Sequence, residues 1–245
     1  MSIDRQEVVV LENIDEIDLC TLKYWKNIAK KAVNERGRFT VALSGGKTPV
    51  SFFKRLAEEK GALPWASTFI FQVDERFVAS SHPDNNFRSI QENLVSKIDI
   101  PAENIKRIPV DADSAAGSAA QYEKTLKDLF RLSEDGFPRF DLIMLGIGED
   151  GHTASLFPGD SALGEVNRLV LGVSYEKVKH ERVTLTLPVL NNSRNIIFTI
   201  CGENKAKVAG KIINEKDGSL PASHIQPVNG KLCYFLRKDA AVCLL

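Results

Sequence analysis

The chain has 245 residues, enough to bury a substantial hydrophobic core, and we expect one domain spanning residues 1–245. Hydrophobic residues make up 43% and charged residues 26%, which is ordinary globular usage and excludes a disordered or fibrous chain. Lys+Arg and Asp+Glu both number 32, so no basic excess predicts a nucleic-acid or membrane partner.

The cysteines and the start of the chain indicate a reducing compartment. The four cysteines, which we interpret as small buried hydrophobes, show no C-x-x-C spacing: Cys20, Cys201, Cys233 and Cys243. The initial MSIDRQE lacks the apolar core of a secretory signal, and no apolar run is long enough to cross a bilayer. We therefore expect a cytoplasmic protein, and the sequence leaves its oligomeric state open.

Strands and helices are predicted to alternate along the chain. In chain order the pattern predicts a strand at 8–11, a helix at 17–33, a strand at 39–43, a helix at 49–59, a strand at 68–73, helices at 86–96 and 114–132, strands at 140–145, 182–187 and 195–200, a helix at 204–214 and a strand at 231–236. This order is typical of an α/β protein with a mainly parallel, Rossmann-like sheet and helices on both faces.

Three polar segments follow predicted strands and are the places to look for a site. They are residues 44–49, 74–76 and 146–158. In open α/β sheets, ligands bind beyond the carboxyl ends of the strands. The three segments are therefore expected to meet at one edge of the sheet.

The first segment, SGGKTP, contains Gly-Lys-Thr but does not match a nucleotide-binding P-loop. That pattern needs a glycine five residues before the second one, where this chain has Val41. What remains is a turn at Ser44, Gly45 and Gly46 that opens a helix near Pro49, a geometry whose N–H groups suit a single phosphate. A tight turn that only caps the helix is the alternative.

The second segment, Asp74-Glu75-Arg76, places an arginine beside two carboxylates. The guanidinium fork of Arg76 can hold a phosphate or carboxylate through two parallel hydrogen bonds. A solvated charge cluster is the alternative. Downstream, residues 84–86 (DNN) are interpreted as an N-cap and turn.

The third segment spells G-x-G-x-x-G from Gly146 to Gly151 but does not predict a dinucleotide site. Such a site needs a long helix after the last glycine, and Pro158-Gly159 interrupts the chain within two turns. The glycines, Gly148 among them, instead allow the backbone to approach a substrate closely and present Asp150 and His152. Histidine is the side chain best suited to take a proton at neutral pH, so His152 is the candidate general base.

No metal site is predicted, because no second histidine or cysteine is placed to make a ligand set with His152. His82 and His180 are interpreted as exposed loop residues, and His224 as part of a late polar loop. A serine-nucleophile mechanism lacks the G-x-S-x-G pattern, although the sequence leaves Ser44 and Ser155 open as nucleophiles.

The chain resembles the 6-phosphogluconolactonase family, part of a superfamily that includes glucosamine-6-phosphate deaminase. The resemblance rests on five stretches in family order: VALSGGKTP (41–49), DER (74–76), LGIGEDGHTASLFPG (145–159), RVTLTLPVLN (182–191) and GENKA (202–206). It implies hydrolysis of 6-phospho-D-glucono-1,5-lactone in the oxidative pentose phosphate pathway, with no cofactor and no metal, so the expected partner is a small sugar-phosphate lactone.

The resemblance also implies roles for individual residues. His152 becomes the general base and Asp150 its partner. The implied binders of phosphate or sugar are Ser44, Gly45, Gly46, Arg76, Arg182 and Lys205. Two local departures from the family pattern are Gln72, where tryptophan is common, and Lys179-His180-Glu181, where a proline-containing approach is expected.

Three alternatives compete with lactone hydrolysis. A deaminase-isomerase of the same superfamily has a segment resembling GHIAFNEP, whereas this chain has GHTASLFP at 151–158 and lacks that glutamate. A non-catalytic sugar-phosphate sensor would use the same pocket. A nucleotide-dependent dehydrogenase comes third, because the glycine motif is not followed by a long helix.

Overall fold

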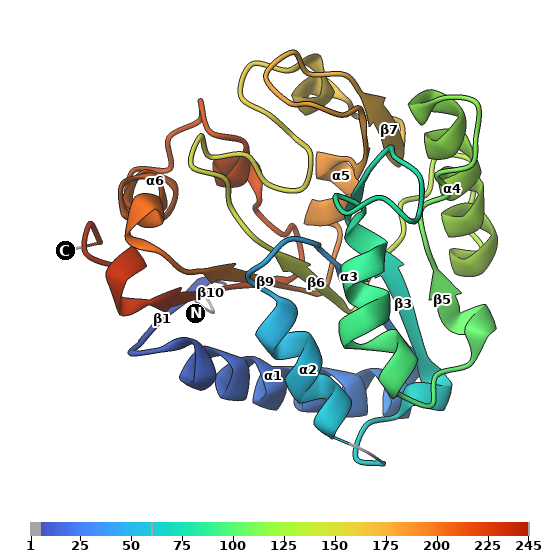
Figure 1. Ribbon diagram of the computed structural model, residues 1–245, viewed down its shortest axis with the longest axis horizontal. Coiled ribbons are helices and arrows are strands. Elements are labelled where there is room, and N and C mark those ends of the chain that lie inside the picture. The colour runs from blue at the N-terminus through green and yellow to red at the C-terminus, as the bar shows by residue number, and fades with distance from the viewer. Residues whose placement is uncertain (1–5, 60, 245) are drawn as a thin grey trace.

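A parallel sheet forms the centre of the computed structural model, which describes residues 6–59 and 61–244 (Figure 1). Its seven strands, in spatial order, are β1 (Gln6–Leu11), β10 (Lys231–Arg237), β9 (Asn195–Ile200), β6 (Leu142–Leu145), β2 (Phe39–Leu43), β3 (Thr68–Gln72) and β5 (Ile105–Lys106). All neighbouring pairs run parallel. The predicted mainly parallel α/β fold is confirmed. The expectation about a secretory signal concerns the start of the chain, whose residues 1–5 lie outside the described residues.

The helices cover the sheet on both faces, as predicted (Figure 1). Their bounds are α1 (Ile14–Arg36), α2 (Val50–Glu58), α3 (Asn86–Asn93), α4 (Ala115–Phe130), α5 (Leu187–Asn191) and α6 (Ala206–Gly210). The long α1 begins where Asn13 Oδ1 accepts a hydrogen bond from Glu16 N at 3.0 Å, and it ends at Gly37, whose φ of 71° favours glycine.

The side chains of the central strands alternate between two apolar cores. Phe39, Val41 and Leu43 of β2 pack toward α1 and α2, whereas Ala42 joins the core on the opposite face. In the first of these cores, Trp25 is fully buried with its ring centroid 5.2 Å from that of Phe39. Burial on both faces explains why the strand sequences are continuous apolar runs.

A second, antiparallel sheet was not predicted. It contains β4 (Asp74–Arg76), β8 (Arg182–Leu185) and β7 (Val170–Val173) in that order. The predicted strand at 182–187 therefore exists only at Arg182–Leu185 and in this sheet, whereas Leu187 begins α5. Val73 connects the two sheets, because its N–H donates to Leu43 O at 3.0 Å and its carbonyl accepts from Leu185 N at 2.9 Å. The chain thus leaves the parallel sheet just before Asp74.

One predicted helix is interrupted. The segment predicted as a helix at 204–214 consists of a 3₁₀ turn at Glu203–Lys205, the α-helical turn α6 and a π-helical turn at Lys211–Glu215. Lys205 therefore lies at the start of this helical segment, just beyond the carboxyl end of β9.

Candidate active site

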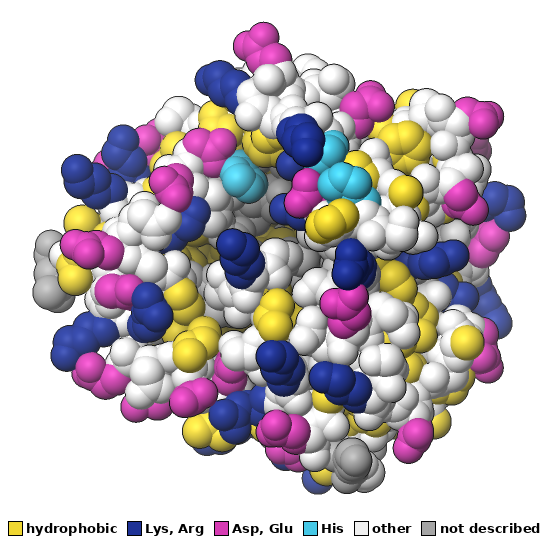
Figure 2. Space-filling model, in the orientation of Figure 1, with side chains coloured by type: hydrophobic (Ala, Val, Ile, Leu, Met, Phe, Trp, Pro, Cys, Tyr) yellow, Lys and Arg dark blue, Asp and Glu magenta, His cyan; other side chains and the backbone are white. Residues whose placement is uncertain are grey.

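A cleft opens at the carboxyl ends of β2 and β6, where the strand order reverses. Within the parallel sheet, the strand that follows β2 is β3, on one side, and the strand that follows β6 is β9, on the other side. This position is therefore the switch point at which α/β sheets bind ligands. The cleft encloses about 220 Å³, less than the ~300–1,000 Å³ typical of drug-sized ligands, and so fits a small ligand. Figure 2 shows this hollow with cationic and histidine side chains around it.

The turn from Ser44 to Gly46 forms one part of the cleft lining. Ser44 Oγ donates to Met144 O at 2.9 Å and so ties the end of β2 to the end of β6. A Cβ on Gly45 would lie 2.1 Å from Asn86 Oδ1, and Gly46 has a φ of 95°, so both positions require glycine. The turn leads into α2, which begins at Val50 with Pro49 as its N-cap.

Arg76 also lines the cleft, and Arg182 lies next to it. The two residues are directly opposite each other in the antiparallel pairing of β4 with β8. Among the described residues, the buried Nε and Nη1 atoms of Arg182 have no hydrogen-bond partner. Burial, followed by the charge of Arg76, lowers the pKa of Arg182 from its ordinary value. Two adjacent guanidinium groups, of which Arg182 has unused donors, are suited to an anionic ligand.

The two acidic residues of the Asp74-Glu75-Arg76 segment have different surroundings. Asp74 is 7% exposed, lines the cleft and accepts from Ser155 Oγ at 2.7 Å. Glu75 is fully buried and accepts four hydrogen bonds, from Arg76 N, Asn86 N, Phe87 N and Gln72 Nε2. Burial nevertheless raises the pKa of Glu75 above its ordinary value. Glu75 therefore organises the start of α3 behind the cleft.

His152 lines the cleft and is paired with Asp150. His152 Nδ1 lies 2.6 Å from Asp150 Oδ1, which also accepts from His152 N at 3.1 Å. Burial raises the pKa of Asp150, but the charge and hydrogen bonds of His152 outweigh burial and hold that pKa below its ordinary value. With Nδ1 donating to the carboxylate, Nε2 is left to accept a proton.

Gly148 lies behind this pair and is buried. A Cβ at this position would be 2.0 Å from His152 Nδ1 and 2.5 Å from Asp150 Oδ1. Gly151, between the two paired residues, has a φ of 82°. Both glycines are thus needed to bring the carboxylate and the imidazole together. Gly148 is not part of the cleft lining, so its predicted contact with substrate remains a prediction.

Lys205 lies near Glu149 and Asp150 and is not part of the cleft lining. Burial lowers the pKa of Lys205, while the carboxylates of Glu149 and Asp150 oppose that shift. Asn204, the preceding residue, donates from Nδ2 to Glu149 Oε1 at 2.6 Å. The segment after β9 therefore supports the loop that carries His152.

The polar residues Lys47, Asn86 and Thr199 also line the cleft but were not among the predicted site residues. Lys47 was not predicted as a binding residue, because the P-loop pattern to which it would belong does not match this sequence. Asn86 was interpreted as part of a turn, and the N-cap prediction is confirmed at Asn85, whose Oδ1 accepts from Arg88 N at 2.9 Å. Thr199 is a polar residue near the carboxyl end of β9, a position that the strand-end rule could have found.

The fold and the site define an α/β protein with an anion-suited cleft and an Asp–His pair at the switch point of its sheet. The chain belongs to the family described as glucosamine-6-phosphate isomerases/6-phosphogluconolactonase, whose model matches residues 15–234.

Individual relatives agree with this assignment. A 6-phosphogluconolactonase of Synechocystis sp. is 41% identical over 212 residues, covering 86% of this chain and 86% of that protein. A 6-phosphogluconolactonase of Nostoc sp. is 39% identical over 212 residues, covering 86% of this chain and 85% of that protein. The crystal structure of the Thermotoga maritima 6-phosphogluconolactonase is 31% identical and superposes with a TM-score of 0.81, covering 95% of this chain and 100% of that chain.

Proposed function

We propose that this protein hydrolyses 6-phospho-D-glucono-1,5-lactone to 6-phospho-D-gluconate, the second step of the oxidative pentose phosphate pathway. The observation that carries the proposal is the Asp150–His152 pair in a cleft that Arg76 and the Ser44–Gly46 turn also line. These groups supply the two requirements of the reaction, a base for water and a binder for the phosphate. The names of the relatives agree with this activity.

Ring opening requires proton transfers that the pair can perform. Water attacks the lactone carbonyl as His152 Nε2 takes its proton, and the ring oxygen leaves with a proton returned by the same imidazole. Asp150 holds the Nδ1–H of the ring and stabilises the charged imidazolium between the two transfers. No covalent intermediate is needed. Ser155 is 2% exposed and donates to Asp74, an arrangement that gives it a structural role.

The substrate phosphate is held by the arginine residues and the glycine turn of the cleft, apart from His152. Arg76 and Arg182 lie side by side, and the unused donors of Arg182 are suited to phosphate oxygens. The backbone of Gly45 and Gly46 and the side chain of Lys47 line the same cleft, just before α2. Binding the remote phosphate positions the lactone carbonyl against His152 and lowers the barrier through orientation.

The proposed partner is this small substrate, and we propose a cytoplasmic location. The four cysteines are free, but the prediction that they are buried holds only for Cys233, since Cys20 and Cys201 are partly exposed and Cys243 is exposed. None of the helices in the described part of the chain has the length and hydropathy of a membrane span.

The test is to generate the lactone with glucose-6-phosphate dehydrogenase and follow its disappearance with and without the purified protein. We expect the protein to accelerate ring opening far beyond the spontaneous rate, and unphosphorylated gluconolactone to be a poor substrate. Two results would contradict the proposal. Ammonia release from glucosamine 6-phosphate without lactonase activity would indicate a deaminase, and tight sugar-phosphate binding without turnover would indicate a sensor.

A further inference from the structure

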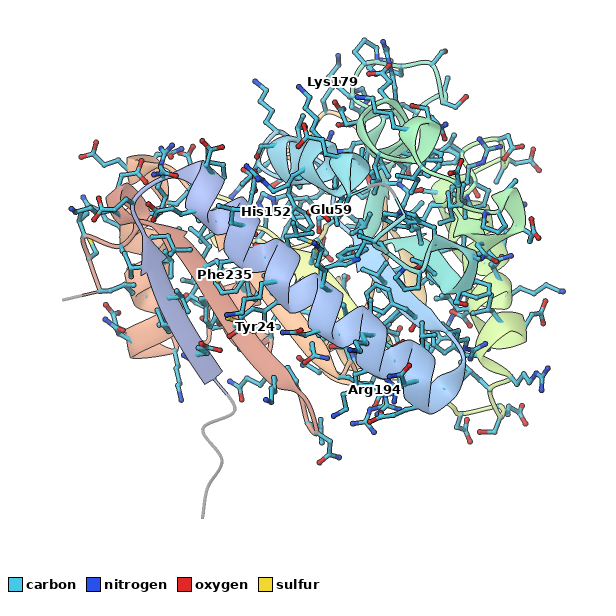
Figure 3. The ribbon with its side chains drawn as sticks, turned by 90° about the horizontal axis from the view of Figure 1, so that it is seen from below. Tyr24, Glu59, His152, Lys179, Arg194 and Phe235 are labelled. Carbon is cyan, nitrogen blue, oxygen red and sulfur yellow. The ribbon has the colours of Figure 1, made fainter. Side chains whose placement is uncertain are left out.

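Two histidines and an aspartate that are distant in sequence lie together at the rim of the molecule. His82 and Asp84 belong to the loop between β4 and α3, and His180 precedes β8. The pairing of β4 with β8 continues beyond the strands, because Phe77 N donates to Glu181 O at 2.8 Å. The segment before β8 is thereby held alongside the loop. Figure 3 shows Lys179, the neighbour of His180, at the outer edge of the structure.

The three side chains have the spacing of a metal-ligand set. Asp84 Oδ2 lies 3.0 Å from His180 Nε2 and 3.9 Å from His82 Nδ1. One ligand atom from each residue lies within 4.8 Å of the other two. Metal bonds of ~2.0–2.2 Å in a tetrahedral site place ligand atoms about 3.3–3.6 Å apart. The two distances from Asp84 bracket that value.

We propose that His82, Asp84 and His180 form a binding site for a divalent transition-metal ion of the zinc class. Two imidazoles and one carboxylate favour such an ion over magnesium or calcium, which prefer oxygen ligands alone. The side chains of His82 and Asp84 are 35% and 49% exposed, which gives the ion a path from solvent and water a place as the fourth ligand. Asp84 N donates to His82 Nδ1 at 3.0 Å, so an ion bound at this nitrogen would replace that hydrogen bond.

The site is next to the cleft without being part of its lining. Arg76 Nη1 donates to the main-chain oxygen of Asp84 at 2.9 Å, which leaves the carboxylate available to the ion. A bound ion would join the loop that contacts Arg76 to the segment that leads into Arg182. The ion is therefore expected to stabilise this edge of the folded protein. The proposal stands independently of the lactonase activity.

The test is to titrate the full wild-type chain with Zn²⁺ and Co²⁺, followed by calorimetry and absorption spectroscopy. The same titrations are made on the variants His82→Asn, Asp84→Asn and His180→Asn. We expect one ion per chain, an affinity at least about tenfold weaker in each variant, and a Co²⁺ spectrum without thiolate charge-transfer absorption. His224→Asn is the matched control, because His224 is exposed and its Nε2 lies 2.8 Å from Gly218 O, away from the three proposed ligands.

The control should bind like the wild type, and each variant is checked by metal-free thermal melting before titration. The removal of any of the three ligands is informative alone, so one misfolded variant does not prevent the test. Absence of wild-type binding, unchanged affinity in the folded ligand variants, or thiolate absorption with Co²⁺ would each overturn the proposal.

Discussion

Two Asp–His pairs in this molecule have similar chemistry but different origins. Asp150 and His152 are separated by one glycine, and their 2.6 Å contact is made within a single loop. Asp84 and His180 come from distant segments, and their 3.0 Å contact depends on the pairing of β4 with β8. The first pair is therefore encoded locally, whereas the second is a product of the tertiary fold.

The electrostatics of the pairs do not distinguish their roles. The pKa of Asp84 is lowered chiefly by its hydrogen bond with His180, and the pKa of Asp150 is lowered by His152 against the opposing effect of burial. What differs is the surroundings, because His152 lines the cleft that Arg76 also lines, whereas His180 does not. The Asp–His pair that shares a cleft with an arginine is therefore the candidate catalytic pair, and substitutions in the two pairs can test this difference.

The largest effect is expected for His152→Gln. We expect turnover of the phosphorylated lactone to fall by about 10²–10⁴-fold, the usual contribution of a positioned general base, with the fold intact. Initial rates on matched protein concentrations measure this, and thermal melting is the control. Near-normal turnover in a folded variant would remove His152 from the mechanism.

Gly148→Ala should disrupt the same pair without changing either member. The added methyl group would meet His152 Nδ1 at 2.0 Å, so the imidazole must move. A displacement of about 1 Å at a reacting group can reduce the rate by ~10²-fold, and we expect a loss of that order in kcat. Gly164→Ala is a matched control, because a Cβ there meets nothing within 4 Å. Equal activities of the two variants would show that the loop tolerates displacement of the pair.

Arg76→Lys should reduce kcat/KM for the phosphorylated lactone by about 10- to 100-fold. Lysine keeps the charge but cannot form the two parallel hydrogen bonds of a guanidinium group. Gluconolactone without phosphate should show a much smaller proportional loss. If both substrates lose activity equally, Arg76 supports the fold or the reaction centre and not the phosphate.

Asp150→Asn should have a smaller effect, with turnover reduced by about tenfold. The amide oxygen can still accept from His152 Nδ1, but the charge that stabilises the imidazolium is lost. The comparison is made by measuring kcat for this variant and His152→Gln under the same conditions. Unchanged turnover would mean that Asp150 only shapes the turn.

His180→Asn should have the smallest effect on catalysis. In metal-free buffer we expect kcat/KM to remain within about twofold of the wild type, the range of surface substitutions away from a site. The same lactone assay measures it. A loss comparable to that of His152→Gln would mean that the rim pair takes part in the reaction and that the distinction between the pairs is wrong.

The sequence predicted the elements whose stability depends on local pattern. The strands at 39–43 and 195–200 are confirmed with the same bounds, because continuous apolar runs identify strands buried on both faces. Of the candidate residues that follow β2 and β6, Ser44, Gly45, Gly46 and His152 line one cleft. These predictions succeeded because parallel strands direct their carboxyl ends to one edge of the sheet.

The features that depend on long-range pairing could not be read from the sequence. Nothing in the segments around Arg76 and Arg182 indicates that these residues lie opposite each other in a second sheet. The same pairing brings His82 near His180, although these two histidines are in separate loops of the sequence.

Gln72, a departure from the family pattern, is explained by its contacts. Its side chain donates to Glu75 Oε2 at 2.7 Å and accepts from Ile108 N at 2.8 Å, so it supports the buried carboxylate behind the cleft. Both partners are set by the tertiary fold, so the sequence alone could not supply this reason.

The tautomer of His152 tests the general-base assignment most directly. It can be measured by long-range ¹H–¹⁵N NMR on the neutral ring, with the His152 signals assigned by comparison with His152→Gln. We predict that the proton resides on Nδ1, held by Asp150, and that Nε2 is unprotonated and ready to accept a proton from water. A wild-type spectrum in which the proton resides mainly on Nε2 would contradict the assignment of this pair as the general base.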